Sequence, residues 1–220
     1  MINTRSSALV DNLDQFVFHI LGCGAIGSSA ALQLARMGAD QFCLYDMDKV
    51  EAVNIGVSQY TLADINKSKV DALEGHIMSI NDNSQVYTYN ERFTEYYSQG
   101  NNDVAILGFD SMESRLQAVE ALCVNKHVKP EFLIDGRMGA EHYQQYIFDK
   151  PTLSKYKKTW YSDSNGSPEP CNAKATAYCS SMSGSFIANA VRKLATGQPF
   201  NRQFSFNFPT MLLEKSVMVS

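Results

Sequence analysis

Short apolar runs alternate along this chain with longer segments in which apolar residues recur every three or four positions. The short runs predict buried strands, and the longer segments predict amphipathic helices. Strands are predicted at residues 16–21, 41–45, 85–89, 103–107 and 132–134, and helices at 25–37, 61–80 and 111–125. Because strands and helices alternate, we expect an α/β fold built on a mainly parallel sheet.

The pattern changes in the C-terminal third. A strand-like segment at 141–148 follows the preceding strand so closely that the two are predicted to be antiparallel. Residues 149–172 are polar and contain several prolines, which predicts a long crossover loop of a kind that is usually functional or mobile. A helix at 173–195 and a closing hairpin at 203–219 complete a single domain over residues 1–220.

The predicted hairpin carries an alternating aromatic pattern. Phe204, Phe206 and Phe208 are separated by polar residues, which is typical of a strand with one buried side. We therefore expect a core-facing strand, with an exposed docking surface as the alternative.

Composition and charge exclude several classes of protein. Of the 220 residues, 45% are hydrophobic and 19% are charged, which suits one ordinary globular domain. The net charge of −4 argues against nucleic acid as the main partner. No stretch approaches the ~18 apolar residues of a membrane span, and no leader pattern precedes the first strand, so we expect no membrane association. Five cysteines without a C-x-x-C pair predict neither a disulfide framework nor a zinc site, and favour the reducing cytoplasm.

A glycine-rich turn joins the first predicted strand to the first predicted helix. Gly22 permits a tight turn, Gly24 lets the backbone approach a phosphate, and Gly27 lets the helix pack on the strand. The free N–H groups at the helix N-terminus favour an anion. Asp46 ends the second strand, where an acidic side chain binds ribose hydroxyls of NAD or ATP equally well. These features predict a nucleotide site in a Rossmann-like, doubly wound sheet.

Three later segments distinguish the two nucleotides. They read Asp46-Met47-Asp48-Lys49-Val50 with Asn54-Ile55 after it, Lys67-Ser68-Lys69-Val70, and Gly108-Phe109-Asp110-Ser111. In order and spacing they resemble the ThiF/MoeB/HesA family, the ubiquitin-activating-enzyme-like adenylyltransferases. The resemblance covers roughly residues 16–197.

The resemblance implies a role for each matching residue. Lys69 would contact the phosphates of ATP, and Asp110 would help to hold magnesium near them, so that both answer the negative charge that develops there. Asp46 would bind the ribose, Asp48 would belong to the same nucleotide-binding set, and Asn54 would lie near the phosphates.

Two departures from the family pattern affect these expectations. Typical members carry an arginine shortly after the asparagine-leucine pair, but the stretch after Asn54-Ile55 has none. A partner subunit can supply an N-terminal arginine in this family, and Arg5 is the one poor candidate. Many bacterial members bind a structural zinc through paired C-x-x-C motifs, which are absent here, so we expect no zinc. Lys67 is the alternative to Lys69 as the phosphate-binding lysine.

Cys171 matches the position of a reactive cysteine in sulfur-transferring members, after a polar loop and before a helix. A helix N-terminus stabilises a thiolate, and Lys174 would add to this effect. Such a thiolate would capture an activated carboxyl group. The alternative is a loop cysteine without a chemical role.

Taken together, the resemblance implies ATP- and magnesium-dependent adenylation of the C-terminal carboxylate of a ubiquitin-like or sulfur-carrier protein, or of a peptide. It also implies a homodimer. An NAD-dependent oxidoreductase is the first alternative, because the glycine turn and Asp46 fit NAD. A non-catalytic nucleotide-binding interaction module is the second, because the expected arginine is missing.

Overall fold

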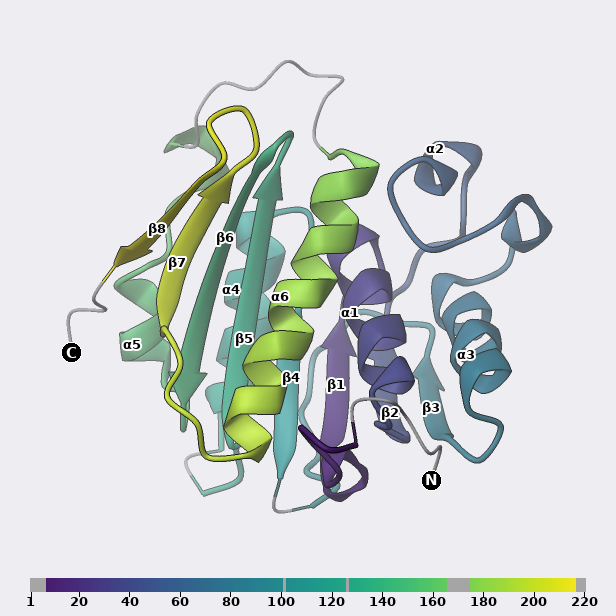
Figure 1. The fold of residues 1–220 in the computed structure, drawn as a ribbon, viewed down its shortest axis with the longest axis horizontal. Helices are drawn as coiled ribbons and strands as arrows, with labels where there is room; N and C mark the ends of the chain where they lie inside the picture. The colour runs from purple at the N-terminus through teal and green to yellow at the C-terminus, as the bar shows by residue number, and fades with distance from the viewer. Residues whose placement is uncertain (1–6, 101, 126, 166–174, 217–220) are drawn as a thin grey trace.

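A computed structural model describes residues 7–100, 102–125, 127–165 and 175–216. Within these residues, eight strands form one sheet in the order β3-β2-β1-β4-β5-β6-β7-β8 (Figure 1). The strands are β1 (Val17–Leu21), β2 (Gln41–Tyr45), β3 (Gln85–Tyr89), β4 (Asp103–Leu107), β5 (Phe132–Gly139), β6 (His142–Asp149), β7 (Gln203–Asn207) and β8 (Leu212–Ser216). The helices are α1 (Ala25–Arg36), α2 (Ala52–Ile55), α3 (Lys69–Ile80), α4 (Met112–Cys123), α5 (Leu153–Lys157) and α6 (Ala177–Ala195), with 3-10 turns η1 (Leu13–Gln15), η2 (Leu62–Asp64) and η3 (Asp163–Asn165).

The sheet divides into a parallel half and an antiparallel half. β3, β2, β1, β4 and β5 pair in parallel, whereas β6, β7 and β8 are each antiparallel to the preceding strand. The reversal follows from chain length, because only a tight turn separates β5 from β6, and a parallel pair needs a long crossover. The predicted doubly wound α/β fold with antiparallel C-terminal strands is confirmed.

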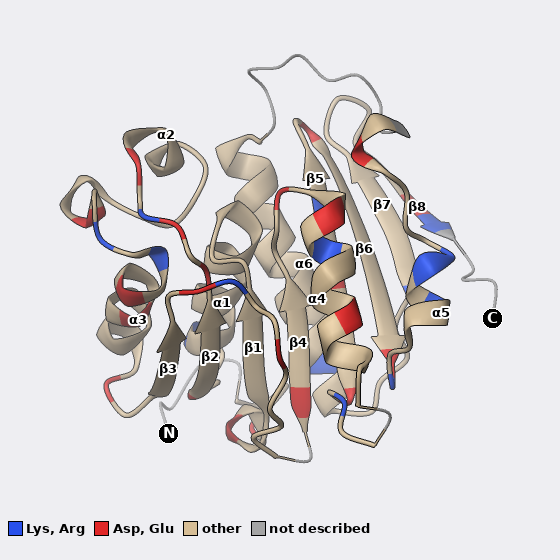
Figure 2. Cartoon of the chain, turned by 180° about the vertical axis from the view of Figure 1, so that it is seen from behind, with Lys and Arg blue, Asp and Glu red and all other residues tan. Residues whose placement is uncertain are grey.

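Helices cover both faces of the sheet. α1, α3 and α6 lie on one face in Figure 1, and α4 and α5 lie on the other, which Figure 2 shows from behind. Each layer encloses its own apolar core, one packed around Phe18, Leu34 and Leu73 and the other around Leu107, Val119 and Tyr156. Among the described residues, no helix is both long enough and apolar enough to cross a bilayer.

The helix predicted at 61–80 is wrong over its first two turns. η2 is a single turn closed by a capping box, and α3 begins only at Lys69. Between them Asn66 has a φ of 71°, a left-handed conformation that a helix of L-residues cannot continue through. The chain re-enters helical geometry after Ser68, whose hydroxyl caps α3.

The loop predicted at 149–172 is not structureless where it is described. It contains α5, whose first turn is capped by the Thr152 hydroxyl, and its Tyr156 is fully buried. Tyr156 donates a hydrogen bond to Asp135 at 3.1 Å, so a contact distant in sequence stabilises a helix that local composition does not predict. The strand predicted to end at 134 continues to Gly139, since pairing with β6 extends it.

Candidate functional site

The glycine turn is packed backbone against backbone. Gly22 has a φ of 92°, and a Cβ built on Gly27 would lie 1.9 Å from the Gly22 carbonyl oxygen. Gly108, just after β4, is equally tight, because its Cβ would lie 2.7 Å from the same oxygen. Glycines at these three positions let β1, α1 and the end of β4 meet. Asp110 follows two residues after Gly108.

The Asp46 carboxylate is anchored at this turn. Its Oδ2 accepts a hydrogen bond from the backbone N–H of Cys23 at 2.8 Å, and its Oδ1 accepts one from the N–H of Asp48 at 2.9 Å. Burial raises the pKa of Asp46, against the opposing effect of Lys69 and of these hydrogen bonds. A carboxylate held this way keeps lone pairs free for a further donor.

Lys69 lies beside Asp46. Its Nζ is 2.8 Å from Asp48 Oδ2 and 3.9 Å from Asp46 Oδ1. The backbone fixes this approach, since the N–H of Lys69 donates to the carbonyl of Asp48 at 3.0 Å. Burial alone lowers the pKa of Lys69, but the two carboxylates raise it overall, so the side chain is a cation. Figure 2 shows acidic and basic residues following one another along the chain that leaves β2.

Lys67 points to a different partner. Its ammonium group pairs with Asp64 at 3.1 Å and is about half exposed. Of the two candidate lysines, Lys69 is the one that the structure brings to Asp46.

Cys23 is buried inside the glycine turn. Burial raises the pKa of its thiol well above the ordinary value, and the negative charge of Asp46 adds to the effect. A thiol in this state is a poor nucleophile. Its small size, which the tight turn requires, is the property that matters.

A cleft of about 290 Å³ opens beside Asp110 at the carboxyl ends of β4 and β5. In open parallel sheets this edge is where ligands bind. The cleft is lined by Asp110, Met112, Arg115, Arg137, Met138, Gly139, His142, Gln144, Tyr161 and Asp163.

Two arginines and one aspartate form a buried charged cluster under this cleft. Arg115 and Arg137 both pair with Asp135, Arg137 through its Nε at 2.8 Å. Arg137 also donates to the Thr159 carbonyl at 2.7 Å, and its guanidinium lies 4.2 Å from the centroid of the Tyr146 ring. Burial alone would raise the pKa of Asp135, but the effect of the two arginines is larger and lowers it overall. The carboxylate is therefore ionised, and the three side chains together carry a net charge of +1. The cluster therefore places one net positive charge beneath the cleft, whose lining also includes the acidic residues Asp110 and Asp163.

Sequence reasoning missed most of this cleft. It singled out Asp110 but not Arg137, Tyr161 or Asp163. Arg137 follows Asp135 on β5 with one residue between them, so both side chains lie on the same side of the strand, and this spacing was a usable signal. No local signal indicates Asp163, which accepts a hydrogen bond from the Met112 N–H across the loop at 2.9 Å.

The other predicted site residues are less closely grouped. Asn54 lies on α2, where its side chain accepts a hydrogen bond from the Glu51 N–H in a capping box. Asp48 is mostly exposed and pairs with Lys69. Cys171 and Lys174 lie outside the described residues, as does Arg5. The predicted helix after Cys171 starts at Ala177 instead of residue 173.

Comparisons with known proteins agree with this architecture. The model of the ThiF family matches residues 2–218. Ubiquitin-like modifier-activating enzyme 5 of Drosophila melanogaster is 30% identical over 124 residues, which are 50% of this chain and 30% of that protein. The Xenopus laevis enzyme of the same name is 29% identical over 137 residues, 54% of this chain and 34% of that protein. The chain thus spans about a third of the length of these curated relatives.

Solved structures share the fold at low identity. PaaA superimposes with a TM-score of 0.74 at 20% identity, covering 99% of this chain and 77% of that one. E. coli MccB crystallised with ATP gives a TM-score of 0.74 at 17% identity, with coverage of 96% and 66%. The microcin C7 biosynthetic enzyme MccB in complex with N-formylated MccA gives 0.76 at 17% identity, with coverage of 96% and 67%.

Proposed function

Because this chain belongs to the ThiF family, we propose that it uses ATP to adenylate a carboxylate of a ubiquitin-like or sulfur-carrier protein, or of a peptide. In this reaction a carboxylate oxygen of the acceptor forms a bond to the α-phosphorus of ATP. The bond between that phosphorus and the bridging oxygen breaks, and pyrophosphate leaves with the bonding electron pair. The reaction needs a site that binds phosphates, neutralises growing negative charge and holds a carboxylate in line.

The single observation that supports the proposal is the position of three features at the carboxyl ends of neighbouring parallel strands. The glycine turn, the Lys69 ammonium beside Asp46, and the cleft at Asp110 lie around the ends of β1, β2 and β4. Gly22 and Gly24 leave the backbone open to a phosphate, and the N-terminus of α1 offers unpaired N–H groups. Asp46 retains acceptor capacity for ribose hydroxyls.

We assign Lys69 to the phosphates. Its present partner, Asp48, is mostly exposed, so exchanging that ion pair for a phosphate contact costs little. Asn54, in contrast, uses its side-chain oxygen within α2, so we assign it only its amide N–H groups as donors toward a phosphate.

A magnesium ion would rely on Asp110. Among the described residues, no group of three or more His, Cys, Asp or Glu side chains is arranged to hold a metal. A single carboxylate such as that of Asp110 suits magnesium, which is commonly held by one or two carboxylates together with nucleotide phosphates. The ion would supply charge neutralisation at the phosphates.

The arginine side of this cleft is suited to the acceptor carboxylate. Arg115 and Arg137 line it, and their charge exceeds that of Asp135 by one. We propose that these arginines supply the positive field that the family normally draws from the arginine missing after Asn54-Ile55.

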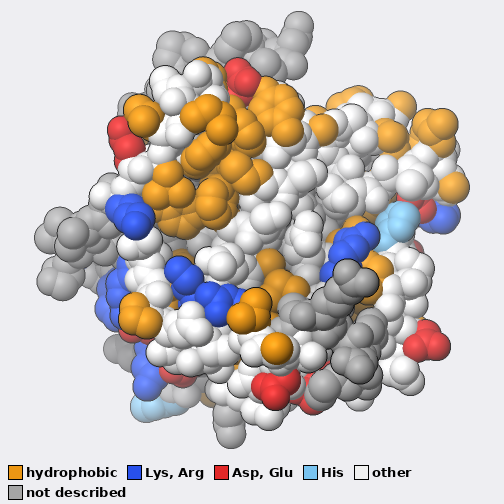
Figure 3. Space-filling view, in the orientation of Figure 1, with side chains coloured by type: hydrophobic (Ala, Val, Ile, Leu, Met, Phe, Trp, Pro, Cys, Tyr) orange, Lys and Arg blue, Asp and Glu red, His pale blue; other side chains and the backbone are white. Residues whose placement is uncertain are grey.

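Two finer assignments also stay proposals. We propose that Cys171 captures the adenylated carboxyl group, and that the active form is a cytoplasmic homodimer. An apolar surface over α6, β7 and β8 supports a covering partner (Figure 3), and exposed apolar side chains on these elements include Tyr178 on α6 and Leu213 on β8. Light scattering on the purified chain tests the dimer.

The central test is ATP–pyrophosphate exchange with the full chain and candidate acceptor proteins or peptides from neighbouring genes. Lys69→Met and Asp110→Asn should each lower exchange by about 10²- to 10³-fold, because each removes a charge that acts at the phosphates. Lys67→Met is the matched control, since Lys67 pairs with Asp64 away from the turn, and it should retain exchange within a few-fold.

Full exchange in both site variants would overturn the roles assigned to them. ATP binding without exchange, for every acceptor tried, would favour a non-catalytic interaction module. Tight NAD binding without ATP binding would favour the oxidoreductase alternative.

A further inference from the structure

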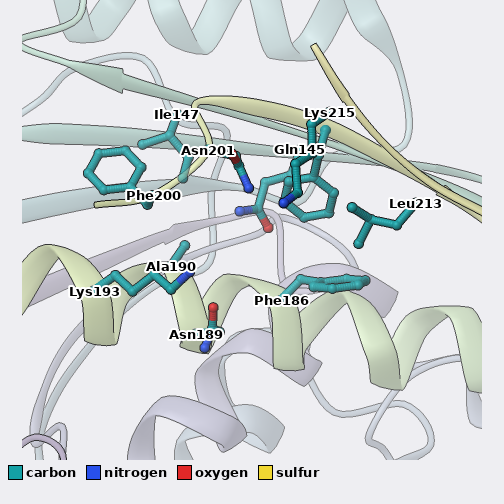
Figure 4. Close-up of a pocket in the computed structure, with 11 residues that line it drawn as sticks. Gln145, Ile147, Phe186, Asn189, Ala190, Lys193, Phe200, Asn201, Leu213 and Lys215 are labelled. Atoms are coloured by element: carbon teal, nitrogen blue, oxygen red, sulfur yellow. The ribbon is translucent and has the colours of Figure 1, made fainter. Parts of the chain in front are cut away.

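A second cavity lies on the opposite part of the molecule, between α6 and the antiparallel strands. It measures about 240 Å³, the liquid volume of roughly eight water molecules at ~30 Å³ each. Its walls come from four segments: β6, α6, the α6–β7 connection with β7, and β8. Figure 4 shows the side chains of the strands directed toward α6 across this space. The lining residues are Gln145, Ile147, Phe186, Asn189, Ala190, Lys193, Phe200, Asn201, Phe204, Leu213 and Lys215.

The charged side chains that line this cavity are both positive. Lys193 enters it from α6 and Lys215 enters it from β8, and no acidic residue lines it. Within the described part of the chain, neither ammonium group has an ion pair or a hydrogen bond. Glu214 lies between Leu213 and Lys215 on β8, so strand alternation directs it to the other face. Two unpaired cations in a chain of net charge −4 favour an anionic ligand.

A buried amide at the cavity floor strengthens the argument. Gln145 is 1% exposed and occupies a β6 position whose neighbours on the same face, Tyr143 and Ile147, are fully buried. A buried polar side chain in such a row is informative because burial without a partner is costly. Its Oε1 accepts a hydrogen bond from the Tyr143 hydroxyl at 2.9 Å. Its Nε2 has no partner among the described residues, so a donor is left facing the cavity.

The remaining walls are apolar and aromatic. Phe186, Phe200 and Phe204 surround the space together with Ile147 and Leu213. Apart from Ala190, polar residues make up the rest of the lining, and a combination of apolar walls with convergent polar groups is typical of a small-molecule site. The cavity is too small for a folded partner and too polar to stay empty of solvent.

We propose that this cavity binds a small apolar carboxylate. The aromatic and aliphatic walls would bury the ligand body, while Lys193, Lys215 and the Gln145 amide would bind its carboxylate. The site is separate from the candidate adenylation site in its residues, so the proposal stands or falls independently of the proposed function.

The test uses the full chain without nucleotide and two matched probes, 3-phenylpropanoate and its neutral amide. Binding is followed by saturation-transfer NMR and by methyl shifts of Ile147 and Leu213. The acid should bind about tenfold more tightly than the amide, since a charge-assisted contact is lost in the amide. Lys193→Gln and Lys215→Gln should each weaken acid binding several-fold without changing amide binding.

Lys158→Gln is the control, because it removes the same charge from an exposed position at the end of α5. It should leave acid binding unchanged. Circular dichroism of every variant shows whether the fold is retained. Equal binding of acid and amide, absence of binding, or equal losses in Lys158→Gln and the two cavity variants would each overturn the proposal.

Discussion

The parallel half of the sheet packs through close backbone contacts, whereas the antiparallel half packs through large aromatic side chains. In the parallel half, β1, α1 and the end of β4 meet through glycine backbones, and Gly27 has no room for a single methyl group. In the antiparallel half, large rings pack between β7 and α6 beside the cavity, with Phe186 and Phe204 edge to face at 4.9 Å. Close backbones leave N–H groups accessible at the glycine turn, whereas the packed rings form the apolar walls of the cavity.

The stability of the two halves should therefore respond in opposite ways to a change in side-chain volume. Adding atoms should damage the parallel half, and removing atoms should damage the antiparallel half. The predictions below test this contrast, beginning with the largest expected effect.

Gly27→Ala should lower the free energy of unfolding by more than about 3 kcal/mol, because the new methyl group would overlap the Gly22 carbonyl and only a backbone shift relieves it. That loss is a large share of the ~5–15 kcal/mol typical of a domain. Urea unfolding followed by circular dichroism measures it. Gly75→Ala is the control, since Gly75 lies within α3 with nothing near its Cβ position, and it should stabilise by about 0.5–1 kcal/mol. Equal effects in both variants would contradict close packing at the turn.

Phe204→Ala should lower the free energy of unfolding by about 3 kcal/mol, because it removes a buried ring that contacts Tyr143 and Phe186. Phe206 is less buried, so Phe206→Ala should cost clearly less. The same urea titration compares the two. A larger loss in Phe206→Ala would mean that the aromatic face does not pack as described.

Acid should loosen the parallel half first. Burial raises the pKa of Asp103, but hydrogen bonds from His19 and Tyr96 outweigh burial and lower it. A lowered pKa stabilises the fold above the unfolded value of about 3.9, and this contribution is lost as pH falls through the folded pKa. Asp103→Asn should therefore cost about 2 kcal/mol at pH 7 and progressively less below pH 4.

Hydrogen exchange at pH 5 and pH 3 locates the effect. In the unsubstituted chain, protection of β4 should fall before that of β7. Asp82→Asn, at an exposed position, should show no change with pH relative to the unsubstituted chain. A cost of Asp103→Asn that does not change with pH would refute the titration argument.

Much of the fold was predictable because its signals are local. Periodicity predicted β1, β2, β3 and β4 almost residue by residue, and the G-x-G-x-x-G spacing identified the turn at Gly22. The start of α3 was not predictable from periodicity, because Asn66 interrupts a segment that is otherwise apolar at helical spacing. α5 was missed because its stability depends on Tyr156 reaching Asp135, which lies on another element.

The candidate site was likewise predictable only where the signal is local in sequence. Lys69 and Asp110 were identified by their resemblance to a family pattern, and Asp46 by its distance from the glycines. Strand pairing alone, however, decided that β2, which precedes Asp46, and β4, which precedes Asp110, lie on either side of β1. The cavity at Gln145 had no such pattern to reveal it, and Arg137 had only its spacing from Asp135 on β5.

By itself the sequence determined the order of strands and helices, the glycine turn and the types of charged residue near it. These depend on backbone preferences and side-chain periodicity within a few neighbouring residues. Tertiary structure alone decided that Arg115, Asp135 and Arg137 share one buried cluster, and that two lysines face an amide across a cavity. Those groups meet only because strand pairing brings distant segments together, and burial then sets the charge and hydrogen bonding of each.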